Sequence, residues 1–206
     1  MTFSHLDLDE FADRAGVDLR RAFGELAALY ARVDARIEAT TKNLNLPCHK
    51  GCDACCRESV FLTTLEFLYV WDQVQKTFDD NAFQEVIARG LALYQQHRVI
   101  IEALEEAHDD PTKRLHWAMQ LKFDCPFLSI EGACRVYPVR ELYGRMFGCS
   151  FNSQGGVYGC SIVGKHLAEQ EVTLVSADSW SRVLQRLPLT NMRQVYPYFI
   201  HHLYGL

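Results

Sequence analysis

Four cysteines within nine residues are the part of this sequence best suited to chemistry. They are Cys48, Cys52, Cys55 and Cys56, in the pattern C-x3-C-x2-C-C. Buried free cysteines behave as small hydrophobic residues and have no packing reason to gather at one place. Thiolates do bind zinc and iron–sulfur clusters, and a loop lets several sulfurs converge on one ion, at about 2.3 Å from zinc. The cluster therefore predicts a metal site.

Four further cysteines follow at long spacings. They are Cys125, Cys134, Cys149 and Cys160. Their spacing alone is weak evidence, but with the first four they supply eight thiols, which is enough for two four-sulfur sites or for one site with spare redox cysteines. All eight are candidate metal ligands. The sequence has no nucleophile–base constellation, phosphate loop or paired carboxylates, so catalytic residues cannot be named and no organic cofactor site is expected.

The cysteines and their neighbours resemble a known family. The shared features are the first cluster, Cys125-Pro126-Phe127-Leu128, Cys134-Arg135-Val136-Tyr137, and then Arg140, Arg145, Phe147 and Cys149. Together they resemble the YkgJ-like cysteine-cluster proteins, described as zinc- or iron-chelating domains, over residues 48–150. The resemblance implies a metal-chelating core. Because the family includes a branch that methylates flagellin lysines, it also implies a protein-modifying role as an alternative.

Two positions depart from that family. Glu141 stands where the family tends to have proline, and Gly144 stands where a cysteine before Arg145 is expected. One ligand implied by the resemblance is therefore missing, and Cys160 is the candidate replacement.

The metal is either an iron–sulfur cluster or zinc, and we favour the cluster slightly. An all-cysteine supply of ligands and the aromatic residues around Cys125 and Cys149 suit iron–sulfur chemistry, although Cys52-x2-Cys55 suits either. The first three cysteines also have the spacing of radical S-adenosylmethionine enzymes. That alternative is disfavoured because the chain lacks alternating strands and helices.

Histidines and arginines near the cysteines are secondary candidates. His49 lies inside the first cluster, and His201-His202 is a pair near the end of the sequence. We interpret these histidines as solvated rather than as ligands. Arg140 and Arg145 are expected to offset thiolate charge or to pair with carboxylates such as Glu58 and Glu66, and anion binding is an alternative.

Composition and charge predict an intracellular location. The first residues lack an apolar signal core, no apolar run approaches the roughly 20 residues that span a bilayer, and the formal net charge is -5. We therefore expect a cytoplasmic protein that binds neither nucleic acid nor membrane, although a protein partner remains open. In a reducing compartment clustered cysteines are more often metal ligands than disulfides, so a secreted disulfide framework is the disfavoured alternative.

The hydrophobic pattern predicts a mainly α fold. Leu19, Phe23, Leu26, Tyr30, Val33 and Ile37 form one stripe of a helix over 17–40. Thr63 and Glu66 predict a capping box for a second helix, and Asp110-Pro111 predicts the start of a helix after one over 82–107. Residues 123–160 read as loop-rich with a short helix near 138–146. Further helices are expected at 176–187 and after Thr190, the last interrupted by Pro197, with room for short strands near 172–175.

We expect one domain over 1–206. It comprises an N-terminal helical segment (1–45), a cysteine-cluster metal-binding core (46–165) and a C-terminal helical segment (166–206). Three hypotheses for function follow. The first is a metal-binding protein whose centre transfers electrons or serves a modification reaction. The second is a protein-modifying enzyme similar to flagellin lysine N-methylases, and the third is a partner-binding helical protein with a structural zinc site.

Overall fold

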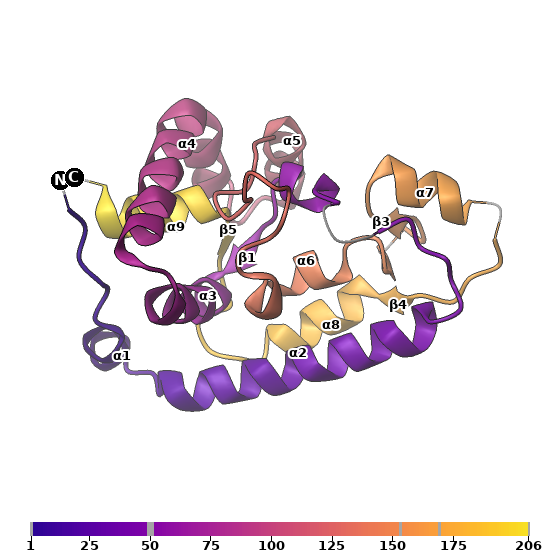
Figure 1. Ribbon diagram of the computed structural model, residues 1–206, viewed down its shortest axis with the longest axis horizontal. Coiled ribbons are helices and arrows are strands. Elements are labelled where there is room, and N and C mark those ends of the chain that lie inside the picture. The colour runs from indigo at the N-terminus through magenta and orange to yellow at the C-terminus, as the bar shows by residue number, and fades with distance from the viewer. Residues whose placement is uncertain (1, 49–51, 153, 169, 206) are drawn as a thin grey trace.

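Helices dominate the computed structural model, which describes residues 2–48, 52–152, 154–168 and 170–205 (Figure 1). The predicted mainly α, single-domain fold is confirmed. The helices are α1 (Leu8–Ala15), α2 (Leu19–Thr41), α3 (Thr64–Thr77), α4 (Asp80–Glu106), α5 (Pro111–Gln120), α6 (Leu142–Met146), α7 (Ser161–Leu167), α8 (Ala177–Leu184) and α9 (Tyr196–Tyr204). The 3-10 turns are η1 (Ala54–Arg57) and η2 (Tyr137–Val139), and the strands are β1 (Leu62–Thr63), β2 (Ser150–Phe151), β3 (Val157–Tyr158), β4 (Val175–Ser176) and β5 (Arg193–Gln194).

Helix α2 runs along one side of the molecule and packs against α3, α6 and α8 (Figure 1). Four residues of the predicted stripe, Leu19, Leu26, Tyr30 and Val33, are buried. The Asp18 side chain accepts the Arg21 N–H in the first turn of α2. This N-cap starts the helix at Leu19, the first residue of the stripe. The apolar stripe therefore belongs to the core.

The predicted capping box forms at the start of α3. The Thr63 hydroxyl accepts the Glu66 N–H, and the Glu66 carboxylate accepts the Thr63 N–H at 2.8 Å. The same buried carboxylate also accepts the Tyr30 hydroxyl of α2 at 3.0 Å and the Leu142 N–H of α6 at 2.8 Å. Glu66 thereby joins three helices by hydrogen bonds that satisfy its charge without a cation.

Helix α4 is long and kinked at His97, where the backbone leaves the helical region, and it packs against α9 and α5. Asp110 caps α5 and Pro111 occupies its first turn, as predicted. No helix in the described ranges combines the length and the apolar character needed to cross a bilayer.

The predicted helix after Thr190 is present as α9, but its predicted cap at Thr190 and its interruption at Pro197 were wrong. Thr190 caps no helix, since its hydroxyl donates to the Leu187 carbonyl at 2.7 Å. Helix α9 begins at Tyr196, so Pro197 lies in its first turn instead of interrupting it. A first-turn proline fits there because its missing N–H would have had no partner within the helix.

Residues 123–160 are loop-rich, as expected. The short helix predicted near 138–146 is α6 at the end of that range, and η2 begins one residue before the range. An antiparallel hairpin of β2 and β3 follows, and β4 pairs parallel to β2. Strand β4 begins at Val175, the last residue of the expected strand region, and ends one residue beyond it. The hairpin was not predicted, because strands of two residues are too short to show an alternating pattern. Helix α7 was not predicted either.

Buried hydrophobic residues form two separate clusters. The main core draws on α2, α3, α4 and α9 and on residues of all three predicted segments. The satellite core, at the end of the molecule that carries α7 and β3 (Figure 1), comprises Val163, Leu167 and Leu174 with the partly buried Leu44, Leu46, Phe151, Val157, Cys160 and Val172. Each core lies beside a different set of cysteines.

Candidate metal centre

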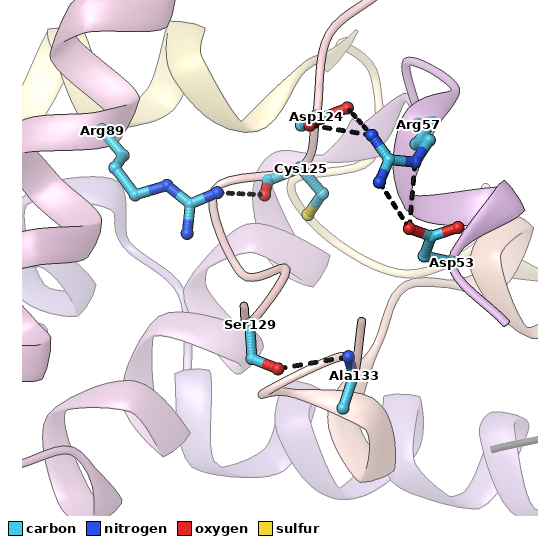
Figure 2. A network of polar contacts seen from close by, with 7 residues as sticks. All are labelled: Asp53, Arg57, Arg89, Asp124, Cys125, Ser129 and Ala133. Carbon is cyan, nitrogen blue, oxygen red and sulfur yellow. Dashed lines mark hydrogen bonds and ion pairs between the residues drawn. The ribbon is translucent and has the colours of Figure 1, made fainter. Parts of the chain in front are cut away.

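The turn η1 presents the last part of the first cysteine cluster. The N–H of Cys56 bonds to the Asp53 carbonyl at 2.8 Å, which closes the turn. Arg57 then reaches in two directions, to the Asp53 carboxylate at 2.6 Å and to the Asp124 carboxylate at 3.0 Å (Figure 2). These exposed ion pairs fix orientation more than they add stability, since such pairs contribute roughly 0–1 kcal/mol.

The loop at Cys125 lies directly against that turn. The Cys125 N–H donates to the Cys56 carbonyl at 2.7 Å, so residues 69 positions apart share a backbone hydrogen bond. From α4, Arg89 donates to the Cys125 carbonyl at 3.2 Å (Figure 2). It also donates to the Leu128 carbonyl at 2.8 Å. One arginine thus holds the loop from the helix side while Arg57 holds it from the turn side.

A small hairpin brings Cys134 back alongside the Cys125 loop. Leu128 and Cys134 form an antiparallel bridge, and the Ser129 N–H bonds to the Ala133 carbonyl at 2.9 Å. The Ser129 hydroxyl also accepts the Ala133 N–H (Figure 2). The residues between the two cysteines form the turn, which includes Gly132 at positive φ.

We call Cys55, Cys56, Cys125 and Cys134 the inner cysteine group. The Cys56 thiol hydrogen-bonds to the sulfurs of Cys134 and Cys55, and these bonds raise the pKa of Cys56 well above its usual value. The same contacts lower the pKa of Cys55 to about 7 and also lower the pKa of Cys134. The sulfurs of this group therefore differ in acidity.

Backbone N–H groups point at two inner sulfurs. Burial raises the pKa of Cys125, and a hydrogen bond from the Phe127 N–H offsets part of that effect. At Cys134, where the hydrogen bond with Cys56 is the largest influence, the Val136 N–H also lowers the pKa. In both loops the donor lies two residues after the cysteine. Such bonds stabilise a thiolate and tune an iron–sulfur centre.

We call Cys48, Cys52, Cys149 and Cys160 the outer cysteine group. The Gly148 N–H donates to the Tyr158 carbonyl at 2.6 Å, which extends the β2–β3 hairpin toward Cys149 and Cys160. A Cβ built on Gly148 would lie 3.7 Å from the sulfur of Cys48, so the side chain of Cys48 lies beside the start of the hairpin.

Two glycines allow the outer group to form. A Cβ built on Gly159 would lie 2.9 Å from the Cα of Gly148, closer than real Cβ atoms approach backbone. The hairpin closes beside Cys149 and Cys160 because Gly159 has no side chain to strike Gly148, and because Gly148 adopts a positive φ of 79° that favours glycine. Repetition of the dipeptide Gly-Cys, at 148–149 and 159–160, is a sequence signal that could have revealed this contact.

Desolvation is the largest influence on the acidity of two outer thiols, those of Cys48 and Cys149. Although Cys48 is exposed as a residue, desolvation of its sulfur and the charges of Cys149, Cys52, Cys160 and Cys55 raise its pKa to about 11. Burial likewise raises the pKa of Cys149, against the charge of Arg140. Thiols with raised pKa values lose their protons on binding a cation, which supplies the missing positive charge.

The charge of Arg140 acts on cysteines of both groups. Its positive charge lowers the pKa values of Cys55 and Cys134 in the inner group and of Cys149 in the outer group. The guanidinium lies 3.7 Å from the ring centre of Tyr137 and donates to the Tyr137 carbonyl at 2.7 Å. This arrangement supports the expected role of Arg140 in offsetting thiolate charge.

Arg145 is buried and has a different environment. It pairs with Asp34 of α2 at 2.5 Å, donates to the carbonyls of Arg140 and Pro138, and lies over the Tyr30 ring at 4.1 Å. These contacts join α6 to α2. Neither Glu58 nor Glu66 pairs with it, and its partner Asp34 was not among the carboxylates expected.

Glu141 carries a buried carboxylate. The sequence alone marked this position only because the family tends to have proline there. It accepts the Tyr196 hydroxyl at 2.5 Å, and burial raises its pKa. Its other oxygen would overlap a Cβ placed on Gly144. The two unusual residues therefore depend on each other, because the Glu141 side chain occupies the space that any side chain at 144 would need.

No three metal-ligating side chains in the described ranges stand close enough to hold one ion. His49 and Gly51 lie outside the described residues. His201 stacks on Tyr94, and a ring nitrogen of His202 lies 2.9 Å from the Tyr198 carbonyl, so both rings pack against α4 and α9. Comparison of the chain with family models, with curated proteins and with solved structures finds no match.

Proposed function

We propose that this protein binds an inorganic centre, an iron–sulfur cluster or zinc, through its clustered cysteines. The observation that supports the proposal is the meeting of cysteines far apart in the sequence. The first cluster contacts the Cys125–Cys134 hairpin through Cys56, and it contacts the β2–β3 hairpin through Cys48. Free thiols have no packing reason to converge in this way.

The chemistry of the donors favours iron–sulfur over zinc. All eight ligand candidates are thiols, and two of them accept backbone N–H groups. Hydrogen bonds to sulfur and partial burial are among the factors that set the potentials of iron–sulfur clusters. A zinc site with four thiolates is the alternative, and it uses the same residues.

Electron transfer and a structural role are the leading candidates for such a centre. One shallow hollow is lined by Gln185, Leu187, Leu189, Thr190 and Asn191, and another lies between α2 and α8. Neither is lined by a cysteine. The protein-modifying role and the likeness to YkgJ-like proteins stay predictions from the sequence.

Anaerobic purification followed by elemental analysis and an absorption spectrum tests the proposal. Iron with acid-labile sulfide and a broad band in the violet would identify a cluster, whereas a colourless protein with stoichiometric zinc would identify the alternative metal. Protein that contains neither and takes up neither on reconstitution would contradict metal binding.

A substitution pair localises the centre. Cys56→Ser should lower the bound metal because Cys56 lies at the middle of the inner group. Ile130→Ser is the matched control, since Ile130 lies in the turn between Cys125 and Cys134 and its side chain is almost fully exposed. The control should keep the metal content of the wild-type protein. Equal metal content in Cys56→Ser would count against the site.

A further inference from the structure

Two arginines lie next to each other without a carboxylate partner. The guanidinium of Arg114 on α5 donates to the carbonyl of Arg193 on β5. Both side chains are only partly exposed, and neither forms an ion pair within the ranges that the structure describes. We call these two residues the arginine pair. Their charges are partly withdrawn from water, which is costly unless an opposite charge meets them.

The other arginines with partial or full burial have a negative partner. Arg89, Arg135 and Arg145 each form an ion pair with a carboxylate, at 3.9, 3.0 and 2.5 Å. The charge of Arg140 acts on cysteines instead, where it lowers pKa values. Every remaining arginine that lacks an ion pair in the described part of the chain is exposed to water. The arginine pair therefore differs from all of these, because it has lost water without gaining an anionic partner.

Aromatic rings hold both guanidiniums in place. The Arg114 guanidinium lies 5.3 Å from the ring centre of Phe61, and the Arg193 guanidinium lies 4.7 Å from the ring centre of Tyr143. The face of an aromatic ring attracts a cation, but it brings no full negative charge and occupies few of the N–H donors. The rings therefore orient the two cations and leave most of their N–H groups available.

Few of these N–H donors meet a protein acceptor. A guanidinium carries about five N–H donors in a fixed plane. Arg114 directs its donors at two carbonyls, that of Leu104 at 3.0 Å and that of Arg193. Arg193 directs one at the Ser181 hydroxyl, at 2.9 Å. These acceptors are neutral, so the described residues orient the pair without supplying the negative charge that it lacks.

We propose that the arginine pair binds an oxyanion, the carboxylate or phosphate group of a small ligand. Guanidinium groups match both kinds of oxyanion, since two parallel N–H groups can donate to neighbouring oxygens. Burial and the charge of Arg193 lower the pKa of Arg114, and a bound anion counteracts that change. The proposal does not depend on metal at the cysteines, so its test is separate from the test of metal binding.

The proposed site lies close to the β2–β3 hairpin, which Cys149 and Cys160 flank. The Tyr143 ring beside Arg193 meets the Tyr158 ring of β3 edge-on, with ring centres 5.5 Å apart. Burial raises the pKa of Tyr158, and the charge of Arg193 opposes that rise. A ligand anchored at the arginine pair by its anionic end therefore lies within a few side chains of the hairpin.

Isothermal titration calorimetry with inorganic phosphate, and separately with succinate, tests for the site. Sodium chloride keeps the ionic strength constant, so that general screening does not change during the titration. The wild-type protein should bind one equivalent of at least one of the two anions, with a millimolar or smaller dissociation constant. Binding of phosphate alone would assign a phosphate ligand, and binding of succinate alone would assign a carboxylate ligand. Absence of binding for both anions would overturn the proposal.

A substitution pair assigns the binding to these residues. Arg193→Gln should weaken it about tenfold or more, because it removes a charge and a planar set of donors. Arg182→Gln is the matched control, since Arg182 is an exposed arginine next to Ser181 and donates to the Asp178 carbonyl at 3.4 Å. The control should bind like the wild-type protein. Equal weakening in both variants would indicate a general effect of charge and would overturn the site.

A nitrogen-15 NMR titration of the wild-type protein locates the anion without relying on a variant. The Nε–H signals of Arg114 and Arg193 and the amide signal of Ser181 should shift together and saturate at one anion concentration. The Nε–H signal of Arg182 should stay in place. Saturating shifts at other arginines, with none at the arginine pair, would contradict the proposal.

Discussion

Unequal acidity within one group of sulfurs is the main chemical feature at the scale of single residues. Cys55, with its pKa lowered to about 7, carries charge near neutral pH, while its neighbour Cys56 keeps its proton. A thiolate is the form that binds metal. Cys55 and Cys134, whose pKa values are lowered, are therefore the inner sulfurs better prepared to bind a cation.

A substitution at Gly144 tests its close contact with the Glu141 side chain. Gly144→Ala should lower the free energy of unfolding by about 1 kcal/mol or more, because the new Cβ meets the Glu141 carboxylate and overpacking costs typically about 1–3 kcal/mol. The carboxylate cannot move aside cheaply, since the Tyr196 hydroxyl holds it at 2.5 Å. Urea unfolding measures the change.

Gly24→Ala is the matched control for that substitution. Gly24 lies in α2 with nothing within 4 Å of the position of a Cβ. Alanine should therefore stabilise the protein by roughly 0.5–1 kcal/mol through helix propensity. If both substitutions stabilise the protein equally, Glu141 does not occupy the space beside Gly144.

The buried Glu141 carboxyl predicts a pH dependence. Burial raises its folded pKa above the usual 4.5, so the folded protein holds this proton more tightly than the unfolded chain. The wild-type protein should therefore lose stability relative to Glu141→Gln as pH rises from about 4.5 through the folded pKa. The glutamine still accepts the Tyr196 hydroxyl. Urea unfolding of both proteins between pH 4 and 8 measures the difference, and a constant difference would refute the raised pKa.

At the scale of elements, helices define the scaffold and hairpins carry the cysteines. Helix α4 supplies Arg89, and η1 supplies Arg57, so the Cys125 loop is held from two sides (Figure 2). Loops on a fixed scaffold commonly carry the functional groups of proteins. Backbone groups, the Ser129 hydroxyl and Arg89 form the hydrogen bonds that shape the inner hairpin.

Arg89→Met should loosen that hairpin. It removes two hydrogen bonds to the carbonyls of Leu128 and Cys125, and the expected loss of unfolding free energy is about 1–2 kcal/mol. Hydrogen exchange over residues 127–136 should speed up as well. Arg98→Met, on the same helix, is the control because Arg98 makes only an exposed ion pair with Glu102, worth roughly 0–1 kcal/mol. Equal effects of the two substitutions would contradict the role of Arg89.

At the scale of the whole molecule, a helical body carries a smaller satellite core at one end (Figure 1). Between the two lie the cysteine groups, with Arg140 in electrostatic range of both. Metal bound there would join parts of the chain that share few hydrophobic contacts. Binding energy would then appear as folding energy, on the order of 10 kcal/mol for a structural zinc site.

Local signals made much of this arrangement predictable. The stripe of α2, the Thr63–Glu66 capping box and the Asp110-Pro111 start each depend on residues close in sequence. Pro197 misled the prediction because the same residue type ends a helix or occupies its first turn, and only the packing of α9 on α4 decides.

The remaining features depend on contacts between distant residues. The approach of Gly148 to Gly159 and the overlap of Glu141 with the space at Gly144 are visible only once the chain has folded. The sequence predicted that eight cysteines were candidate ligands but left open how they divide. That division depends on which hairpin each cysteine joins, and two-residue strands show no pattern in sequence.

Titration of the thiols with an organomercurial reagent, with simultaneous measurement of released metal, tests the central claim most directly. Anaerobically purified wild-type protein is titrated under native conditions. Metal binding predicts that iron or zinc leaves in proportion to the thiols modified, and that chelation beforehand makes all eight thiols react quickly. Rapid reaction of all eight thiols in the untreated protein, with no metal released, would contradict it.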